Sequence, residues 1–271
     1  MPELPEVEIV TRNLNQIVKP FEKVVEIKFY RKNLRNIIPV KAIQKLAGMQ
    51  IKRIYRRAKF IIFEFAEGSI ISHLGMTGYW RIEQLGWIKK KHDHISIQLE
   101  AGRFLVYNDA RRFGEFDYFL ASEVGLRFKN FGPEPLAVDT DFEKLTADFK
   151  KLKTVIKVAL MNQKNIVGVG NIYASEALFQ AKIKPTRIAS RITKVEYAKL
   201  WTEVQKVLDK AILAGGSSIQ SYQNSYGEKG SFQFQFAVYD RVNQACLFCG
   251  AKIKNLYLGG RSSFWCSCCQ K

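Results

Sequence analysis

The sequence is 271 residues long with 47% hydrophobic residues, which allows a buried core and excludes a disordered or fibrous chain. Its apolar runs, such as residues 60–63, are too short to cross a bilayer, and no signal-peptide pattern is present, so a cytoplasmic protein is expected. Lysine and arginine number 43 against 25 acidic residues, and the net charge of +18 is spread along the chain. This excess favours a polyanionic partner, with nucleic acid ahead of an anionic membrane because no basic amphipathic anchor helix is evident.

The first residues combine a proline with two acids, Glu3 and Glu6. Methionine is usually removed before a small residue, and removal of Met1 would leave Pro2 with a secondary amine that titrates far below lysine. Such an amine can attack a sugar carbon and collapse to an iminium. The same residues also suit a proline-stiffened helix start with acids at its N-terminus. Apolar residues then recur at helical spacing and predict an amphipathic first helix: Val7, Val10, Leu14 and Ile17.

From about residue 24 to residue 98 the pattern changes to short β-rich runs separated by turns, and one more such run follows before the turn at residue 109. Short strands at close intervals predict an antiparallel β-sandwich or barrel, here assigned to a first domain of residues 1–130. The expected strands are Val24–Tyr30, Ile51–Tyr55, Phe60–Phe65, Ser69–His73, His94–Leu99 and Phe104–Tyr107.

Basic and apolar residues stand out in the turns between these strands. Lys59 follows Arg56-Arg57-Ala58 at a hairpin tip, where it can reach a phosphate or stay solvated. Met76 lies between two glycines, so it can wedge into a base stack or pack in a core. His73, at the end of a strand, can contact a phosphate or make a structural hydrogen bond.

A later turn, residues 109–114, places two arginines beside an aromatic residue. Arg111 and Phe113 can combine a phosphate or base-edge contact with a stacking plane. The alternative is an ion pair between Asp109 and an arginine within the loop, with Phe113 tucked inward.

Residues 131–140 contain Gly132, Pro133 and Pro135, which a helix or central strand would not tolerate, and they predict a linker. A helical domain is expected over residues 141–240. Its first helices are predicted at Asp141–Phe149, Val155–Met161 and Ile172–Gln180, and a longer helix begins after Thr193, which forms a capping box with Glu196.

The glycine-bearing turn before residue 171 predicts a phosphate cradle, because it exposes backbone N–H groups at a helix N-terminus. Asn171 can cap that helix or contact phosphate, and Lys157 adds charge one helix earlier. The polar segment 217–230, which begins with Ser217, predicts a loop that closes over a ligand. Residues Phe232–Tyr239 predict a strand, with Tyr239 able to bond a phosphate.

All five cysteines lie within the last 26 residues, and four follow the pattern C-x2-C-x16-C-x2-C. Four thiolates at this spacing predict one tetrahedral, structural Zn²⁺ site formed by Cys246, Cys249, Cys266 and Cys269. Cys268 is a competing ligand whose spacing fits less well, and disulfides are disfavoured in a cytoplasmic chain. The predicted zinc finger, residues 241–271, can offer Arg261 to phosphates.

In chain order these motifs resemble the bacterial formamidopyrimidine-DNA glycosylases, whose helix–two-turns–helix motif is matched by Val169-Gly170-Asn171-Ile172-Tyr173-Ala174-Ser175-Glu176. The resemblance implies an α+β fold. An N-terminal antiparallel β-sandwich with flanking helices precedes a C-terminal helical domain with the helix–two-turns–helix and a β-hairpin zinc finger. It further implies an enzyme of base excision repair, and a monomer is the default expectation. Ala58, Ser263 and Ser267 stand where the family usually has glycine, threonine and proline, and none of the three is a zinc ligand.

By the same resemblance, the protein excises 8-oxoguanine and formamidopyrimidines from duplex DNA through a Schiff base on Pro2, followed by β,δ-elimination. Glu3 assists proton transfer, Glu6 orders the site, and Lys59 contacts the lesion site. Met76, Arg111 and Phe113 fill the gap left by the extruded base, and the 217–230 loop covers that base with Tyr222. The remaining residues expected at DNA are His73, Lys157, Asn171, Tyr239 and Arg261.

Two alternatives remain. A sister glycosylase for oxidised pyrimidines shares this layout but typically has glycine where Leu4 stands here. A non-catalytic zinc-finger DNA-binding protein follows if Met1 is retained, because an acylated Pro2 nitrogen cannot attack.

Overall fold

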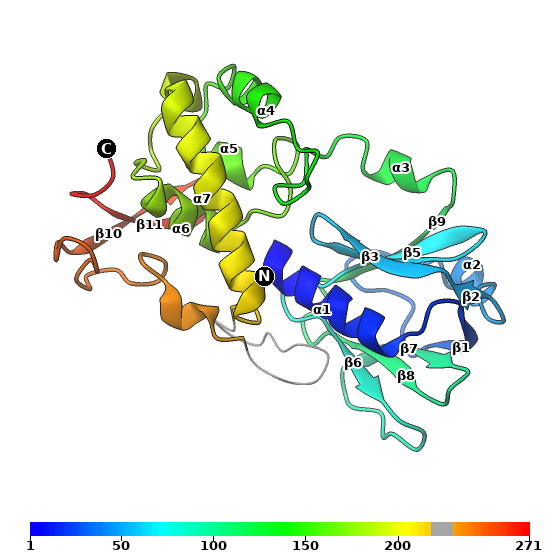
Figure 1. Cartoon of the computed structure of the whole chain (residues 1–271). Coiled ribbons are helices and arrows are strands. Elements are labelled where there is room, and N and C mark those ends of the chain that lie inside the picture. The colour runs from blue at the N-terminus through cyan, green and yellow to red at the C-terminus, as the bar shows by residue number, and fades with distance from the viewer. Residues whose placement is uncertain (218–229) are drawn as a thin grey trace. The chain divides into compact units, whose positions relative to one another are not determined.

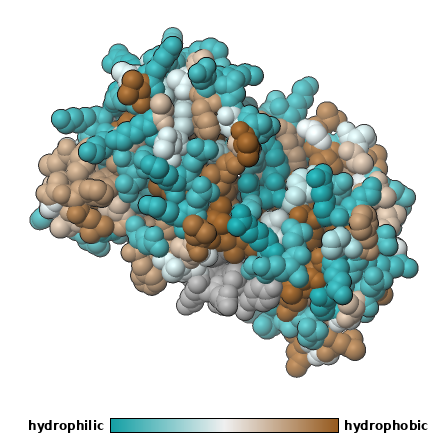
Figure 2. All heavy atoms as spheres, viewed as in Figure 1, coloured by the Kyte–Doolittle hydropathy of each residue, from teal (hydrophilic) through white to brown (hydrophobic). Residues whose placement is uncertain are grey.

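The computed structural model describes residues 1–217 and 230–271, and its contacts divide the chain into two compact units (Figure 1). One contains Met1–Lys129 and the described residues of Gly215–Ser231, and the other contains Asn130–Ala214 and Phe232–Lys271. The linker expected at 131–140 and the start of the zinc finger at 241 stay predictions. In the described part of the chain, every helix is too short or too polar to span a bilayer. Hydrophilic residues predominate on the face drawn in Figure 2, and hydrophobic ones form separate patches.

The first unit is built on two antiparallel sheets. A five-stranded sheet has the order β2-β1-β7-β8-β6, and a four-stranded sheet has the order β3-β4-β5-β9 (Figure 1). The strands are β1 Glu22–Phe29, β2 Gln50–Ile51, β3 Arg53–Arg57, β4 Phe60–Glu64, β5 Gly68–His73, β6 Tyr79–Glu83, β7 Asp93–Leu99, β8 Phe104–Asn108 and β9 Glu115–Leu120. Apolar side chains of both sheets, such as Phe63 and Ile97, pack into one buried cluster, which confirms the predicted β-sandwich.

Helices complete this unit. Val7, Val10 and Leu14 of α1 (Leu4–Ile17) join the sandwich core, as their spacing predicts. Two short helices, α2 (Val40–Gln44) and α3 (Val124–Arg127), also belong to the described part of this unit. Because α1 is anchored along this stripe, the first residues of the chain have a fixed place on the sandwich.

The second unit is mainly helical and ends in a hairpin. Its elements are α4 Phe142–Phe149, α5 Ile156–Met161, α6 Asn171–Gln180, the 3-10 turn η1 Ala189–Arg191, α7 Lys194–Leu213, the 3-10 turn η2 Phe232–Gln235, β10 Ile253–Leu258 and β11 Arg261–Cys266. The predicted capping box of α7 is present, since Thr193 and Glu196 each accept the backbone N–H of the other. A small buried cluster under the hairpin includes Phe179, Val238 and Ile253.

Two strand predictions differ from the structure. The run expected as Ile51–Tyr55 is divided between β2 and β3, which belong to different sheets. The strand expected at Phe232–Tyr239 is absent: residues 232–235 form η2, and the N–H groups of residues 237–239 donate to the buried carboxylate of Glu176. These donors are thereby unavailable for a ladder with a neighbouring strand.

Candidate active site and metal centre

The beginning of α1 brings Pro2, Glu3 and Glu6 together. Glu3 is the N-cap residue, and Leu4 and Pro5 are the first helical residues. The Glu3 N–H donates to Oε2 of Glu6 at 2.9 Å, and the Glu3 carboxylate accepts the Glu6 N–H, which forms a reciprocal capping box. Glu3 and Glu6 are 3% and 2% exposed, and Pro2 is also buried. The helix start predicted from these residues is therefore confirmed, and it holds the residues of the expected reactive group together, whose chemistry stays a prediction.

The other oxygen of Glu6 holds the chain where the polar segment begins. Its Oε1 accepts the backbone N–H of Ser217 at 2.8 Å and the Ser217 hydroxyl at 3.0 Å. Gly216 permits this approach, because it has φ +80° and a Cβ there would lie 3.2 Å from Oε1 of Glu6. Sequence reasoning selected Ser217 but not its partner, which lies 211 residues away. Tyr222, the ring expected to cover the base, lies outside the described residues.

The β3–β4 hairpin tip is fixed to α1 by an ion pair. Nε of Arg56 donates to Oε2 of Glu8 at 2.8 Å, and Nη1 of Arg56 donates to the Ala58 carbonyl at 2.9 Å. Burial by itself raises the Glu8 pKa, but the hydrogen bonds from Arg56 and Arg12 outweigh burial and hold the pKa below its ordinary value. Ala58 adopts the positive φ that the turn requires, 54°. This conformation places Lys59, which is 6% exposed, at the tip.

His73 ends β5 as a neutral imidazole. Its Nδ1 accepts the Gly75 N–H at 3.1 Å, so the ring proton is assigned to Nε2. Burial, and then the positive charges of Lys59, Arg35 and Arg127, lower the His73 pKa to about 4. At neutral pH this electropositive neighbourhood would therefore offer a phosphate an N–H donor from His73 and a charge from Lys59.

Two loops present the expected wedge residues. Met76 is partly exposed in the loop between β5 and β6, and Phe113 is 45% exposed in the loop between β8 and β9. The Arg111 guanidinium lies 4.7 Å from the Phe113 ring centroid. Asp109 accepts hydrogen bonds from Thr77 and Gly114, so the alternative of an arginine ion pair with an inward Phe113 does not describe this loop.

In the second unit, α5 and α6 hold the terminal hairpin. Lys157 is fully buried and donates from Nζ to Oγ of Ser263 at 2.7 Å and to the Ser262 carbonyl at 3.1 Å. Nδ2 of Asn171 donates to the same carbonyl at 3.0 Å. Gly170 is the N-cap of α6, so the capping role considered for Asn171 is wrong. Both side chains meet the hairpin backbone, which ties the glycine turn to β11.

A buried carboxylate organises the approach to this hairpin. Glu176 is 2% exposed and accepts the N–H groups of residues 237, 238 and 239 at 2.8 to 3.0 Å. Burial raises the Glu176 pKa, although these three bonds favour the charged form. The Tyr239 ring packs against Phe264 of β11, with centroids 5.0 Å apart. This role was missed in the sequence analysis. Glu176 is the one charged residue of α6, and a lone charge in an otherwise uncharged helix indicates a buried carboxylate that needs hydrogen-bond donors.

The predicted cysteine ligands converge. The Sγ atoms of Cys246, Cys249, Cys266 and Cys269 all lie within 4.8 Å of one another. Sγ separations of 3.9 Å for Cys246 and Cys269, and 3.5 Å for Cys249 and Cys266, suit thiolates about 2.3 Å from one tetrahedral metal ion. Cys268 is exposed and outside this group. The four cysteines therefore form a metal site.

Arg261 begins β11 after a turn of two glycines with positive φ, 55° at Gly259 and 71° at Gly260. Its side chain is exposed. The turn thus presents one cation at the tip of the hairpin, as expected.

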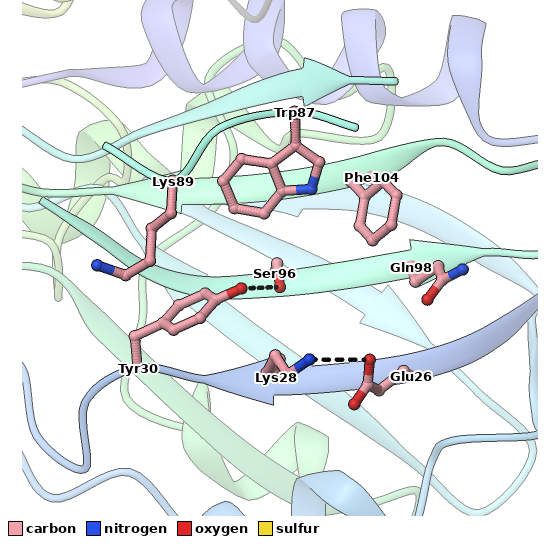
Figure 3. Close-up of a pocket in the computed structure, with 8 residues that line it drawn as sticks. All are labelled: Glu26, Lys28, Tyr30, Trp87, Lys89, Ser96, Gln98 and Phe104. Atoms are coloured by element: carbon pink, nitrogen blue, oxygen red, sulfur yellow. Dashed lines mark hydrogen bonds and ion pairs between the residues drawn. The ribbon is translucent and has the colours of Figure 1, made fainter. Parts of the chain in front are cut away.

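A separate pocket lies on the face of the five-stranded sheet opposite the core (Figure 3). It encloses about 240 Å³ and is lined by Glu26, Lys28, Tyr30, Trp87, Lys89, Ser96, Gln98 and Phe104. The Lys89 ammonium lies 5.1 Å from the Tyr30 ring centroid, and Nζ of Lys28 lies 3.6 Å from Oε2 of Glu26. None of the expected site residues lines this pocket, so it is distinct from the candidate active site.

Two family models match most of the chain. Residues 1–116 match the formamidopyrimidine-DNA glycosylase N-terminal domain, and residues 131–223 match the formamidopyrimidine-DNA glycosylase H2TH domain. The chain belongs to the formamidopyrimidine-DNA glycosylase family. The formamidopyrimidine-DNA glycosylases of Bdellovibrio bacteriovorus and Vibrio atlanticus are 44% and 37% identical to it over 271 and 270 residues, with 100% of each chain covered.

Solved structures of formamidopyrimidine-DNA glycosylases share this fold. A Lactococcus lactis FPG mutant in complex with a Fapy-dG containing DNA has a TM-score of 0.91 at 33% identity, and 100% of each chain is covered. MutM in complex with carbocyclic 8-oxo-G containing DNA has a TM-score of 0.90 at 33% identity, also with 100% of each chain covered. The family and the α+β fold inferred from the motifs are confirmed.

Proposed function

We propose that this formamidopyrimidine-DNA glycosylase excises oxidised purines, including 8-oxoguanine and formamidopyrimidines, from duplex DNA and then cleaves the strand as a lyase. The observation that carries the proposal is the buried capping box that holds Glu3 and Glu6 next to Pro2. Structures of relatives bound to DNA with Fapy-dG, an abasic site or carbocyclic 8-oxo-G support damaged DNA as the substrate.

Pro2 supplies the nucleophile in this proposal. Removal of Met1 leaves a secondary amine with a pKa near 8, whose lone pair attacks C1′ of the damaged nucleotide. The bond from C1′ to the base breaks, the Pro2 nitrogen gives up its N–H proton, and the departing base takes up a proton. Protonation of the sugar ring oxygen, assisted by Glu3, opens the ring and leaves an iminium between the Pro2 nitrogen and C1′.

The iminium makes the C2′ proton acidic. Loss of that proton expels the 3′ phosphate, and a second elimination expels the 5′ phosphate, so the strand is cleaved on both sides. Hydrolysis of the iminium returns the amine. Glu6 does not take part in bond changes; its two oxygens hold the Glu3 backbone and Ser217 in place.

The remaining site residues bind and shape the DNA. Lys59 and neutral His73 contact phosphate or the lesion, and Met76, Arg111 and Phe113 fill the vacancy left by the extruded base, which lowers the cost of extrusion. In the second unit, Asn171, Tyr239 and Arg261 contact DNA, and Lys157 acts through the hairpin to which it is bonded. Tyr222 remains the residue proposed to cover the base.

Zn²⁺ fits the four-cysteine site. Four thiolates complete a tetrahedral shell, so the ion holds the hairpin and leaves no open position for substrate. We place the protein in the cytoplasm as a monomer on DNA.

Borohydride trapping tests the function. Protein with Met1 removed, verified by intact mass, is incubated with duplexes that carry 8-oxoguanine opposite cytosine, an oxidised pyrimidine, or no damage. A covalent adduct and strand cleavage are expected with the 8-oxoguanine duplex. The absence of any adduct from zinc-loaded protein would contradict the lyase, and an adduct with the oxidised pyrimidine alone would identify the sister activity.

A further inference from the structure

The two loops that carry the wedge residues are joined by hydrogen bonds around one buried carboxylate, that of Asp109. Asp109 is fully buried, and its Oδ1 accepts the Thr77 hydroxyl at 2.5 Å. Its Oδ2 accepts the Gly114 N–H at 2.8 Å. Thr77 Oγ1 in turn accepts the Arg111 N–H at 3.0 Å. Thr77 belongs to the loop of Met76, whereas the other residues belong to the loop of Phe113, so each bond to Thr77 crosses from one loop to the other.

Close packing reinforces this junction. A Cβ at Gly75 would lie 2.4 Å from the backbone carbon of Phe113. A Cβ at Gly78 or Gly114 would lie 2.2 or 1.9 Å from the Tyr107 hydroxyl oxygen. The two loop backbones therefore touch at Gly75, and Gly78 and Gly114 both pack on the Tyr107 hydroxyl, in each case where no side chain fits. The Asp109 carbonyl is also fixed, by Nε2 of His94 at 2.8 Å.

We propose that Thr77 and Asp109 are positioning residues that clasp the two loops into one rigid body, so that Met76, Arg111 and Phe113 enter the base stack together. The inference rests on the proposed function. Asp109 is buried and acts through the wedge residues rather than on DNA. Filling a stacking vacancy with three side chains from two loops requires that the loops keep a constant spacing, because ordering them at the moment of insertion would add an entropic cost.

The Thr77→Val substitution removes the clasp with little change of shape. It leaves Asp109 Oδ1 and the Arg111 N–H without their Thr77 partner. The single-turnover rate on an 8-oxoguanine duplex should then fall about tenfold. A single-stranded abasic oligonucleotide has no base stack to fill, so its cleavage should stay within about twofold of wild type. Thr77→Ser keeps the hydroxyl and should restore the duplex rate.

A spectroscopic reading separates wedge insertion from chemistry. 2-Aminopurine placed next to the lesion should brighten more slowly with Thr77→Val than with Thr77→Ser, since the probe reports unstacking. In a Phe113→Ala background, Thr77→Val should lower the single-turnover rate on the duplex by a clearly smaller factor than in the wild type. The reason is that the clasp then has one wedge residue fewer to position. An equal fold-loss of the duplex rate in both backgrounds would overturn the inference.

The outcomes separate the clasp from the function itself. If wild type cleaves neither substrate, the proposed function fails. If wild type cleaves both and Thr77→Val matches it on duplex, or loses both substrates equally, the clasp is wrong. Should Thr77→Val fail to fold by circular dichroism, Thr77→Ala is the second variant. It also removes the hydroxyl that bonds both Asp109 and the Arg111 N–H, so the same duplex-selective loss is required.

Discussion

Single carboxylates set the geometry of this glycosylase because each one serves more than one chain segment. Glu6 divides its oxygens between the Glu3 N–H and Ser217, and Glu176 accepts three consecutive N–H groups. Truncation of such a buried acceptor leaves several donors unpaired, at about 1–3 kcal/mol each. At the scale of residues, these acids therefore contribute position, while the nitrogen that we propose as the nucleophile belongs to Pro2.

Substitution of Pro2 tests the nitrogen directly. Pro2→Gly should keep borohydride trapping at a reduced level, because methionine is also removed before glycine and leaves a primary amine that can form a Schiff base. Gel-resolved adduct on an 8-oxoguanine duplex measures the yield. The matched control is wild type with an uncleaved N-terminal tag, in which the Pro2 nitrogen is acylated. Trapping by the tagged protein equal to that of processed protein would show that another amine reacts.

His73 should make folding stability depend on pH. Its pKa is lowered to about 4 from 6.5, so between these values the unfolded chain binds the proton and the folded chain does not. This contribution to stability is complete above about pH 6.5 and is lost as pH falls toward 4. Relative to His73→Gln, wild type should lose about 1–2 kcal/mol of unfolding free energy between pH 7.5 and pH 5. Urea denaturation of both proteins at both pH values measures the difference. An equal loss of unfolding free energy in wild type and His73→Gln would show that the His73 pKa is not lowered by folding.

At the scale of elements, the terminal hairpin depends on two sets of attachments. The cysteine cluster closes its base, and Lys157 and Asn171 donate to the Ser262 carbonyl of β11. The hairpin has a small core of its own, so metal binding supplies much of its folding free energy. Loss of one cysteine ligand should therefore displace Arg261, which begins β11 of the same hairpin, although Arg261 is not a metal ligand.

The cysteines provide a matched pair for this expectation. Cys246→Ser removes a ligand and should abolish DNA binding through collapse of the finger, whereas Cys268→Ser removes an exposed thiol outside the cluster and should change nothing. Zinc content by atomic absorption and DNA affinity by fluorescence anisotropy report both effects. Normal affinity in the Cys246→Ser protein would refute a structural role for the metal.

Local patterns predicted most elements, and non-local partners account for the errors. The capping box of α7 and the cysteine spacing are encoded within a few residues, so they could be read directly. The strand expected at residues 232–239 is absent because its donors are taken by Glu176, which lies more than 60 residues away. The contact between Glu6 and Ser217, and the clasp between Thr77 and Asp109, likewise leave no local sequence pattern. Motif order predicted the family and supplied the candidate site residues, whereas the hydrogen-bond partners of those residues required the fold.

At the scale of the whole molecule, net charge sets how DNA binding responds to salt. The chain carries +18, and neutralised phosphates release counterions, so log affinity should fall linearly with log salt by about 0.9 per phosphate contact. Arg261→Gln should flatten the slope by about one contact, because this exposed cation stands at the hairpin tip. Lys206→Gln is the control, since Lys206 is exposed on α7 and paired with Glu203 at 3.1 Å. Anisotropy titrations from low to high salt measure both slopes. An unchanged slope for Arg261→Gln would remove that residue from the DNA contacts, whereas an equal loss for Lys206→Gln would mean that affinity follows total charge rather than placed cations.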